Sequence, residues 1–146
     1  MKKYIILLSV VIVSLLTGCK SKESNENSYA ESLSKSQKIE IKMIDSSEIY
    51  LIDEKEDIET FIKNIKVDSW ELDESPEEME TEREFIFYQK PTKELSDGSK
   101  SKNKLIEAAK LITYKDVPYV NFTIENFSLT FQIPEEIGQY LNTLGN

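Results

Sequence analysis

Histidine is absent from this chain of 146 residues, and cysteine occurs once, at position 19. Without histidine the chain has no Ser-His or Cys-His catalytic pair, no histidine metal site and no ordinary proton shuttle at neutral pH. With one cysteine it forms no internal disulfide and no multi-thiolate metal site. A fold built from this sequence therefore depends on its apolar core alone.

Positive charge is also scarce. The chain has 18 basic and 27 acidic side chains, a net charge of −9, and its only arginine is Arg83. Binding to nucleic acid requires clustered lysine and arginine against the phosphates, so nucleic acid is excluded as a partner. The same charge disfavours an electrostatic hold on an anionic membrane surface.

The N-terminal segment has the pattern of an export signal. Lys2 and Lys3 precede an apolar stretch over residues 4–16 that only Ser9 and Ser14 interrupt. These 13 residues are fewer than the roughly 20 that a membrane-spanning helix needs. A basic start followed by a short apolar stretch is typical of a secretory signal peptide.

The end of this stretch, Leu16-Thr17-Gly18-Cys19, resembles the lipobox of bacterial lipoproteins. The resemblance implies that a diacylglycerol group is attached to the Cys19 thiol and that cleavage follows Gly18. Two acyl chains hold a protein stably in a bilayer, whereas one chain alone binds marginally. We therefore expect a lipid-anchored protein on the outer face of the cell membrane. The alternative is an ordinary signal peptide with an incidental cysteine.

The rest of the chain divides into a tether and one domain. We expect a signal peptide at 1–18, a lipidated cysteine with a flexible tether at 19–37, and a globular domain at 38–146. The predicted tether is rich in serine and asparagine, and Tyr29, Ala30 and Leu33 are its only apolar residues, too few to offset the entropy of ordering it. Removal of residues 1–18 takes away two lysines and no acids, which leaves a net charge of −11.

The apolar pattern of the domain alternates between two periods. A period of two predicts strands, and a period of 3.6 predicts helices. The helix over 58–65 should begin at an N-cap Asp53 with Glu56 three residues later, and Pro134 should open the last helix, which Gly145 ends. Residues 105–114 fit both periods, and we predict a helical first half that becomes extended by Ile112. The strands are expected at 38–43, 48–52, 70–72, 85–88, 120–124 and 127–133.

Strands in hairpins and no regular βαβ alternation place the domain in the α+β class. We predict an antiparallel sheet of about five strands, with two or three helices packed on one face.

The segment 68–84 is the most unusual in composition, because nine of its 17 residues are acidic. One interpretation is a calcium site, since extracellular modules bind calcium through several carboxylate oxygens. The spacing does not match an EF-hand loop, and a solvated acidic loop is the simpler interpretation. The candidate calcium ligands are Asp68, Asp73, Glu74 and Glu77.

The same segment is also the candidate for contact with a partner. An acidic surface attracts a protein with a basic patch, mainly by raising the rate of association. The candidate contact residues are Trp70, Glu77, Glu78 and Glu80. A third interpretation, a hydrolase that uses paired carboxylates, has no specific support because acids occur throughout the chain.

From these patterns we expect a membrane-tethered, non-enzymatic binding domain that recognises another envelope protein or a ligand and has no cofactor. The alternatives are a calcium-responsive module and a carboxylate-based hydrolase.

Overall fold

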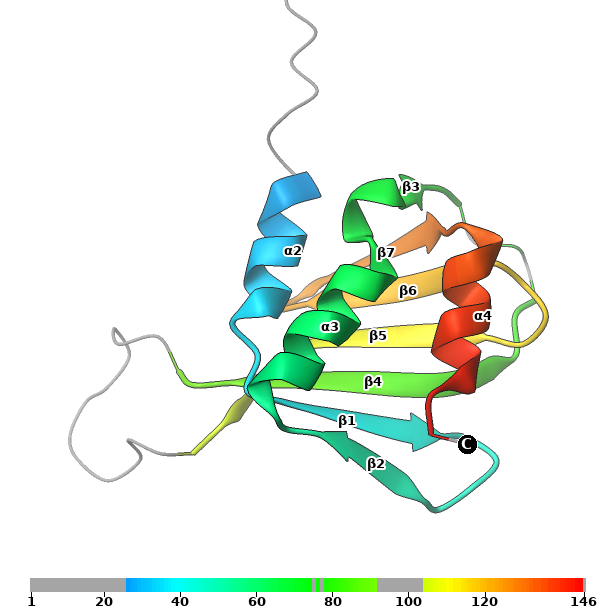
Figure 1. Cartoon of the computed structure of the whole chain (residues 1–146). Coiled ribbons are helices and arrows are strands. Elements are labelled where there is room, and N and C mark those ends of the chain that lie inside the picture. The colour runs from blue at the N-terminus through cyan, green and yellow to red at the C-terminus, as the bar shows by residue number, and fades with distance from the viewer. Residues whose placement is uncertain (1–25, 75, 77, 92–103, 146) are drawn as a thin grey trace, which may run out of the picture.

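The computed structural model describes residues 26–74, 76, 78–91 and 104–145, and the predicted signal peptide and the lipobox lie outside these ranges. It is an α+β fold in which three helices lie on one face of an antiparallel sheet (Figure 1). The sheet has seven strands in the order β2-β1-β4-β5-β6-β7-β3 rather than the five we expected. No helix in the described ranges combines the length and the apolar character that a membrane crossing requires.

The first half of the sheet is built on the predicted hairpin of β1 (Lys38–Met43) and β2 (Ile49–Ile52). β1 pairs on its other side with β4 (Thr81–Gln89), in a register that sets Ile39 opposite Phe87 and Ile41 opposite Phe85. These four side chains are almost completely buried beneath the helices. The alternation of the sequence therefore predicted the buried face of β1 correctly.

The second half contains β5 (Ile106–Tyr114), β6 (Tyr119–Ile124) and β7 (Phe127–Gln132), joined by short turns. The prediction of a helix in the first half of 105–114 was wrong, because β5 is a strand throughout. A register shift between Phe87 and Tyr88 leaves Ala108 without a partner in the ladder. Such a bulge changes which face each side chain occupies, and this obscured the period of two.

The remaining strand is very short. β3 (Glu71–Leu72) pairs with the end of β7 and forms one edge of the sheet. Its neighbour Trp70 is buried, and the indole Nε1 donates a hydrogen bond of 2.8 Å to the Ile65 carbonyl. The chain thus crosses from helix to sheet edge with its one tryptophan in the core.

The middle helix is α3 (Lys55–Ile65), and it presents Ile58, Phe61 and Ile65 to the sheet, as its sequence predicted. The Phe61 ring lies 5.7 Å from the ring of Phe85, between centroids. The helix starts one residue later than expected.

The N-terminus of α3 lacks the side-chain cap that the sequence suggested. The N-cap is Glu54 rather than Asp53, and no side chain caps the first turn. At the other end the Lys66 ammonium lies 2.7 Å from the Glu136 carboxylate of α4 (Glu135–Thr143). This contact holds the pKa of Glu136 below, and that of Lys66 above, its ordinary value.

The first described helix, α2 (Glu26–Ser34), lies within the predicted tether. Leu33 is almost completely buried, and the Tyr29 ring meets the ring of Phe122 edge-on at 5.7 Å. The backbone of Gln37 then donates to the carbonyl of Tyr88, which fastens the segment to β4. The boundary at residue 38 was therefore wrong, because two apolar side chains in a polar segment are enough to cover the end of the core.

Candidate functional site

The acidic segment does not form a cluster of metal ligands in the described ranges. Asp68 lies in the short 3-10 helix η1 (Val67–Ser69), whereas Asp73 and Glu74 follow β3, and all three are exposed. Asp73 accepts a hydrogen bond from the Tyr119 hydroxyl at 3.1 Å. Glu77 lies outside the described residues. Within those ranges, no three acidic, histidine or cysteine side chains are arranged to hold a metal ion.

The candidate contact residues are likewise dispersed. Trp70 belongs to the core, where its ring lies 5.7 Å from that of Phe131, so it is not available to a partner. Glu78 is exposed in the loop before β4. Glu80 is exposed as well, but it contributes to a different feature, the polar network described below.

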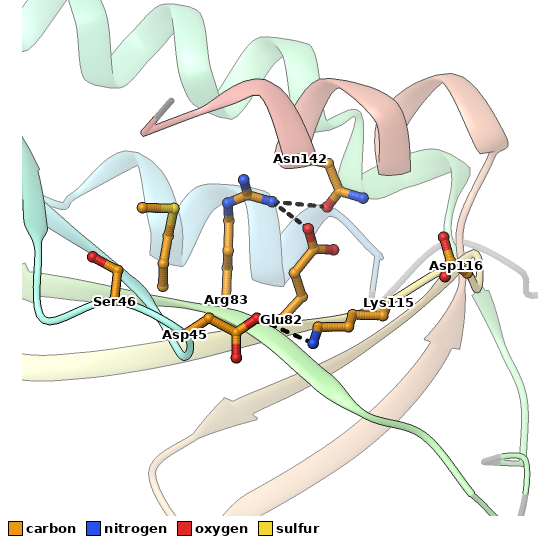
Figure 2. Close-up of a pocket in the computed structure, with 8 residues that line it drawn as sticks. Asp45, Ser46, Glu82, Arg83, Lys115, Asp116 and Asn142 are labelled. Carbon is orange, nitrogen blue, oxygen red and sulfur yellow. Dashed lines mark hydrogen bonds and ion pairs between the residues drawn. The ribbon is translucent and has the colours of Figure 1, made fainter.

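The described surface has a groove beside α4, which we call the α4 groove. It consists of two cavities that share Asp116 and Asn142. The charged cavity has a volume of about 350 Å³, and it is lined by Met43, Asp45, Ser46, Glu82, Arg83, Lys115, Asp116 and Asn142 (Figure 2). The amide cavity has a volume of about 590 Å³, and it is lined by Asp116, Val117, Pro118, Gln132, Ile133, Glu135, Gly138, Gln139 and Asn142.

The wall of the groove follows from the periodicity of α4. Ile137 and Leu141 are buried against the sheet. A neighbouring stripe at positions 135, 138, 139 and 142 has the i, i+3, i+4, i+7 spacing of one helix face, and it lines the groove. This stripe is polar, so the sequence alone did not distinguish it from a solvated surface.

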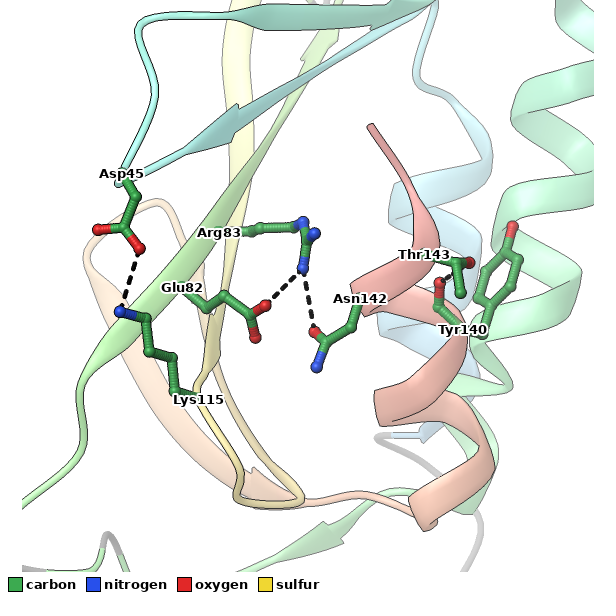
Figure 3. A network of polar contacts seen from close by, with 7 residues as sticks. All are labelled: Asp45, Glu82, Arg83, Lys115, Tyr140, Asn142 and Thr143. Carbon is green, nitrogen blue, oxygen red and sulfur yellow. Dashed lines mark hydrogen bonds and ion pairs between the residues drawn. The ribbon is translucent and has the colours of Figure 1, made fainter. Parts of the chain in front are cut away.

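Arg83 is the most buried charged residue of the groove, with 4% of its surface exposed. It lies on β4 two residues before Phe85, and therefore on the same face of the sheet as the core. Its guanidinium donates through Nη1 to Glu82 at 2.8 Å and to the Asn142 side chain at 3.4 Å (Figure 3). A buried guanidinium needs such partners, because an unpaired charge in the interior is costly.

Lys115 is the second cation of the polar network, beside Arg83 with its partners Glu82 and Asn142. Its ammonium lies 2.6 Å from Glu80 and 3.1 Å from Asp45, so that it joins the loop before β4 to the turn after β1. The hydrogen bonds to Glu80 and to Asp45 raise the pKa of Lys115 to about 12. The lysine is therefore a fixed cation at any physiological pH.

Asp116 occupies the turn between β5 and β6 with a φ of 55°. This left-handed conformation is tolerated by aspartate and asparagine better than by most residues. The turn is fixed to the base of α4, because the backbone of Ile133 donates to the Pro118 carbonyl at 2.9 Å. The carboxylate of Asp116 thus lies between the two cavities on a well-supported turn.

The groove does not contain an evident nucleophile with its base. Ser46 is the one hydroxyl among the lining residues, and its oxygen accepts a hydrogen bond from the backbone of Glu48. A general base must be able to accept a proton near the working pH. Lys115, with its raised pKa, does not meet that requirement.

Three carboxylates line the charged cavity, which is the type of arrangement that a carboxylate hydrolase uses. Two of them already neutralise a cation, since Glu82 pairs with Arg83 and Asp45 pairs with Lys115. Only Asp116 makes no ion pair within the described ranges. Asp116 is therefore the carboxylate of the charged cavity that no described cation neutralises.

Comparison with protein-family models, with curated proteins and with solved structures gives no match for this chain. The fold and the groove are consequently interpreted from its own residues.

The sequence analysis missed the groove, although one signal was present. Alternation along β4 places Arg83 on the face of Phe85 and Phe87, which identifies the single arginine of the chain as a buried one. The other lining residues come from turns and from the polar side of a helix. Their approach depends on tertiary structure that no local pattern records.

Proposed function

We propose that the chain is a membrane-anchored lipoprotein whose domain is a non-enzymatic binding module, and that the α4 groove binds a segment of another envelope protein. The observation that carries this proposal is the groove itself, in which the buried Arg83 pairs with Glu82 and the partly exposed Lys115 pairs with Asp45 and Glu80. A preformed concave site with few mobile charges favours binding, because little ordering is needed when the ligand enters.

The position of the groove supports its use as a recognition surface. α3 lies between α2 and α4 (Figure 1). Because α4 lines the groove, the groove is on the side of the domain away from α2. An anchor at Cys19 would hold the chain from the α2 side. The groove would then remain accessible to proteins of the envelope.

The test blocks the groove by a substitution that leaves the core intact. A Cβ at position 138 would have the Ile133 side chain at 3.8 Å as its one neighbour, so larger side chains extend into the amide cavity. We would compare wild type, Gly138→Leu and Gly138→Ala, each as the full chain in its own cells, by reversible cross-linking and purification from membranes. Thermal unfolding of each variant checks that it is folded.

We expect an envelope protein that is cross-linked to, and purified with, wild type and Gly138→Ala. This protein should be absent from the purification of Gly138→Leu. Recovery of the same components from all three folded variants would show that the groove is not the binding surface.

A further inference from the structure

The amide cavity is the half of the groove that contains no cation. Its polar lining consists of carboxylate and carboxamide side chains, and the remainder is mainly apolar. Because carboxamides both donate and accept hydrogen bonds, they suit a neutral polar group such as a peptide bond. The carboxylates add a requirement for positive charge.

Asp116 is the carboxylate that is available to pair with a positive group of the ligand. It makes no hydrogen bond or ion pair to any residue in the described ranges, whereas its neighbour Lys115 is held by Glu80 and Asp45. Arg83, on the far side of the charged cavity, donates to Glu82 and Asn142. The cations near Asp116 are thus engaged elsewhere, and its negative charge faces the cavity without compensation.

The apolar wall of the cavity adjoins Asp116. Val117 and Pro118 come from the same turn as Asp116, and Ile133 supports them from the start of α4. A lysine side chain combines an aliphatic stem with a terminal ammonium, and it gains from apolar contact along the stem while its charge is paired. The carboxylate and this apolar wall match the two parts of that side chain.

We propose that the amide cavity binds the lysine side chain of an extended peptide segment. Asp116 pairs with the ammonium, the apolar wall contacts the stem, and the Gln132 and Gln139 amides bond the peptide groups beside it. This assignment rests on the proposed function and specifies the chemistry of the partner. An acidic or phosphorylated segment is disfavoured, because the net charge of −9 and the two carboxylates of the cavity, Asp116 and Glu135, repel it.

The assignment is tested by titration calorimetry of the full-length chain, extracted from membranes in a non-ionic detergent. The probe is acetyl-Gly-Lys-Gly-amide, whose only charge is the side-chain ammonium. Acetyl-Gly-norleucine-Gly-amide keeps the stem without the charge, and acetyl-Gly-Glu-Gly-amide reverses it. Cadaverine, a free diamine, separates an amine without a peptide from a lysine within one.

Asp116→Asn removes the charge and keeps both the shape and the tolerance for a positive φ. Glu125→Gln is its matched control, because Glu125 is also an exposed acid with a positive φ of 52°, in the turn between β6 and β7. Gly138→Leu fills the cavity without altering its charge.

We expect the lysine peptide to bind wild type and Glu125→Gln equally, and Asp116→Asn and Gly138→Leu at least tenfold more weakly. Binding should also weaken with added salt, as an ion pair does when it is screened. Equal affinity for the norleucine peptide, an unaffected Asp116→Asn, or no binding of the lysine peptide would overturn the assignment. If cadaverine bound as tightly as the lysine peptide, the proposed contacts of the Gln132 and Gln139 amides with peptide groups would be overturned.

The two proposals fail in different ways. If membrane capture depends on an open groove but the lysine peptide does not bind, the groove is used and the ligand assignment is wrong. If capture does not depend on the groove, the proposed function fails, whatever the peptides do.

Discussion

The two glycines near the C-terminus illustrate how one substitution can have opposite effects in different positions. Gly145 has a φ of 88° just after α4, and a Cβ there would lie 2.8 Å from the ring of Tyr50. Gly138 lies inside α4, where a Cβ has room. The backbone and the neighbours of each position therefore decide the result of adding one methyl group.

We expect Gly145→Ala to lower the free energy of unfolding by about 1–2 kcal/mol from the left-handed backbone alone, with a further loss from the displacement of Tyr50. Gly138→Ala should raise it by about 0.5–1 kcal/mol, because alanine favours the helix interior. Denaturant unfolding of both variants measures the two values. A stabilised Gly145→Ala would show that α4 ends differently.

The polar network makes a prediction for alkaline pH. Because the folded state raises the pKa of Lys115 to about 12, it holds this proton more tightly than the unfolded chain does. The resulting stability is fully present below the unfolded pKa of about 10.4 and is lost as the pH rises through the folded value.

Lys115→Met should therefore be less stable than wild type at pH 8, and the difference should narrow as the pH rises above about 10.4. Unfolding temperatures at a series of pH values, measured for both proteins, provide the test. The variant is needed because other side chains, such as Tyr88, also have raised pKa values. A difference that is constant across this range would mean that Lys115 is not held as the network implies.

At the scale of the elements, α2 changes the boundary of the domain. Leu33 is 1% exposed although its neighbours in sequence are serines. We expect Leu33→Ala to cost roughly 2–5 kcal/mol, the usual range for a buried leucine. Glu31→Ala, on the exposed side of the same helix, is the control and should cost little.

Unfolding by denaturant distinguishes a packed α2 from a detached one. A Leu33→Ala variant as stable as Glu31→Ala would mean that the helix does not contribute to the core, and it would restore the interpretation of residues 26–37 as a tether.

The elements that the sequence predicted share a physical property. β1, β6 and β7 each have one buried face and one face in water, so their alternation is clear. β5 shows the same alternation of buried and half-buried residues from Ala109 onward, but a bulge at Ala108 interrupts its period. α2 has too few apolar residues to be recognised before the core that it covers is known.

The groove was harder to predict than the fold for a related reason. Buried positions in a strand recur every second residue, and Arg83 can be recognised as buried because it alternates with Phe85 and Phe87 along β4. Asp116 and Gln139 are exposed polar residues in a turn and on a helix, like many others in this chain. Only the packing of α4 against the sheet brings them together.

At the scale of the whole molecule, the helices cover one face of the sheet (Figure 1). The α4 groove lies beside the last of these helices. The proposed anchor determines where this surface is presented. We expect Cys19→Ser to abolish lipidation, so that the protein appears in the soluble exported fraction or remains unprocessed. Fractionation with metabolic labelling by a fatty acid measures this, and a variant that stays in the membrane at mature size would refute the anchor.

The central claim is that the α4 groove, rather than another surface, is used for recognition. The most direct measurement places a photo-cross-linking residue at Gln139 in the groove, at Leu51 on the exposed edge strand β2, or at Thr123 on the open face of the sheet, each in the full chain in living cells. We expect a cross-linked species from position 139 that the other two positions do not give. The same species from position 51 or 123, with none from 139, would contradict the claim and move the binding surface to the sheet.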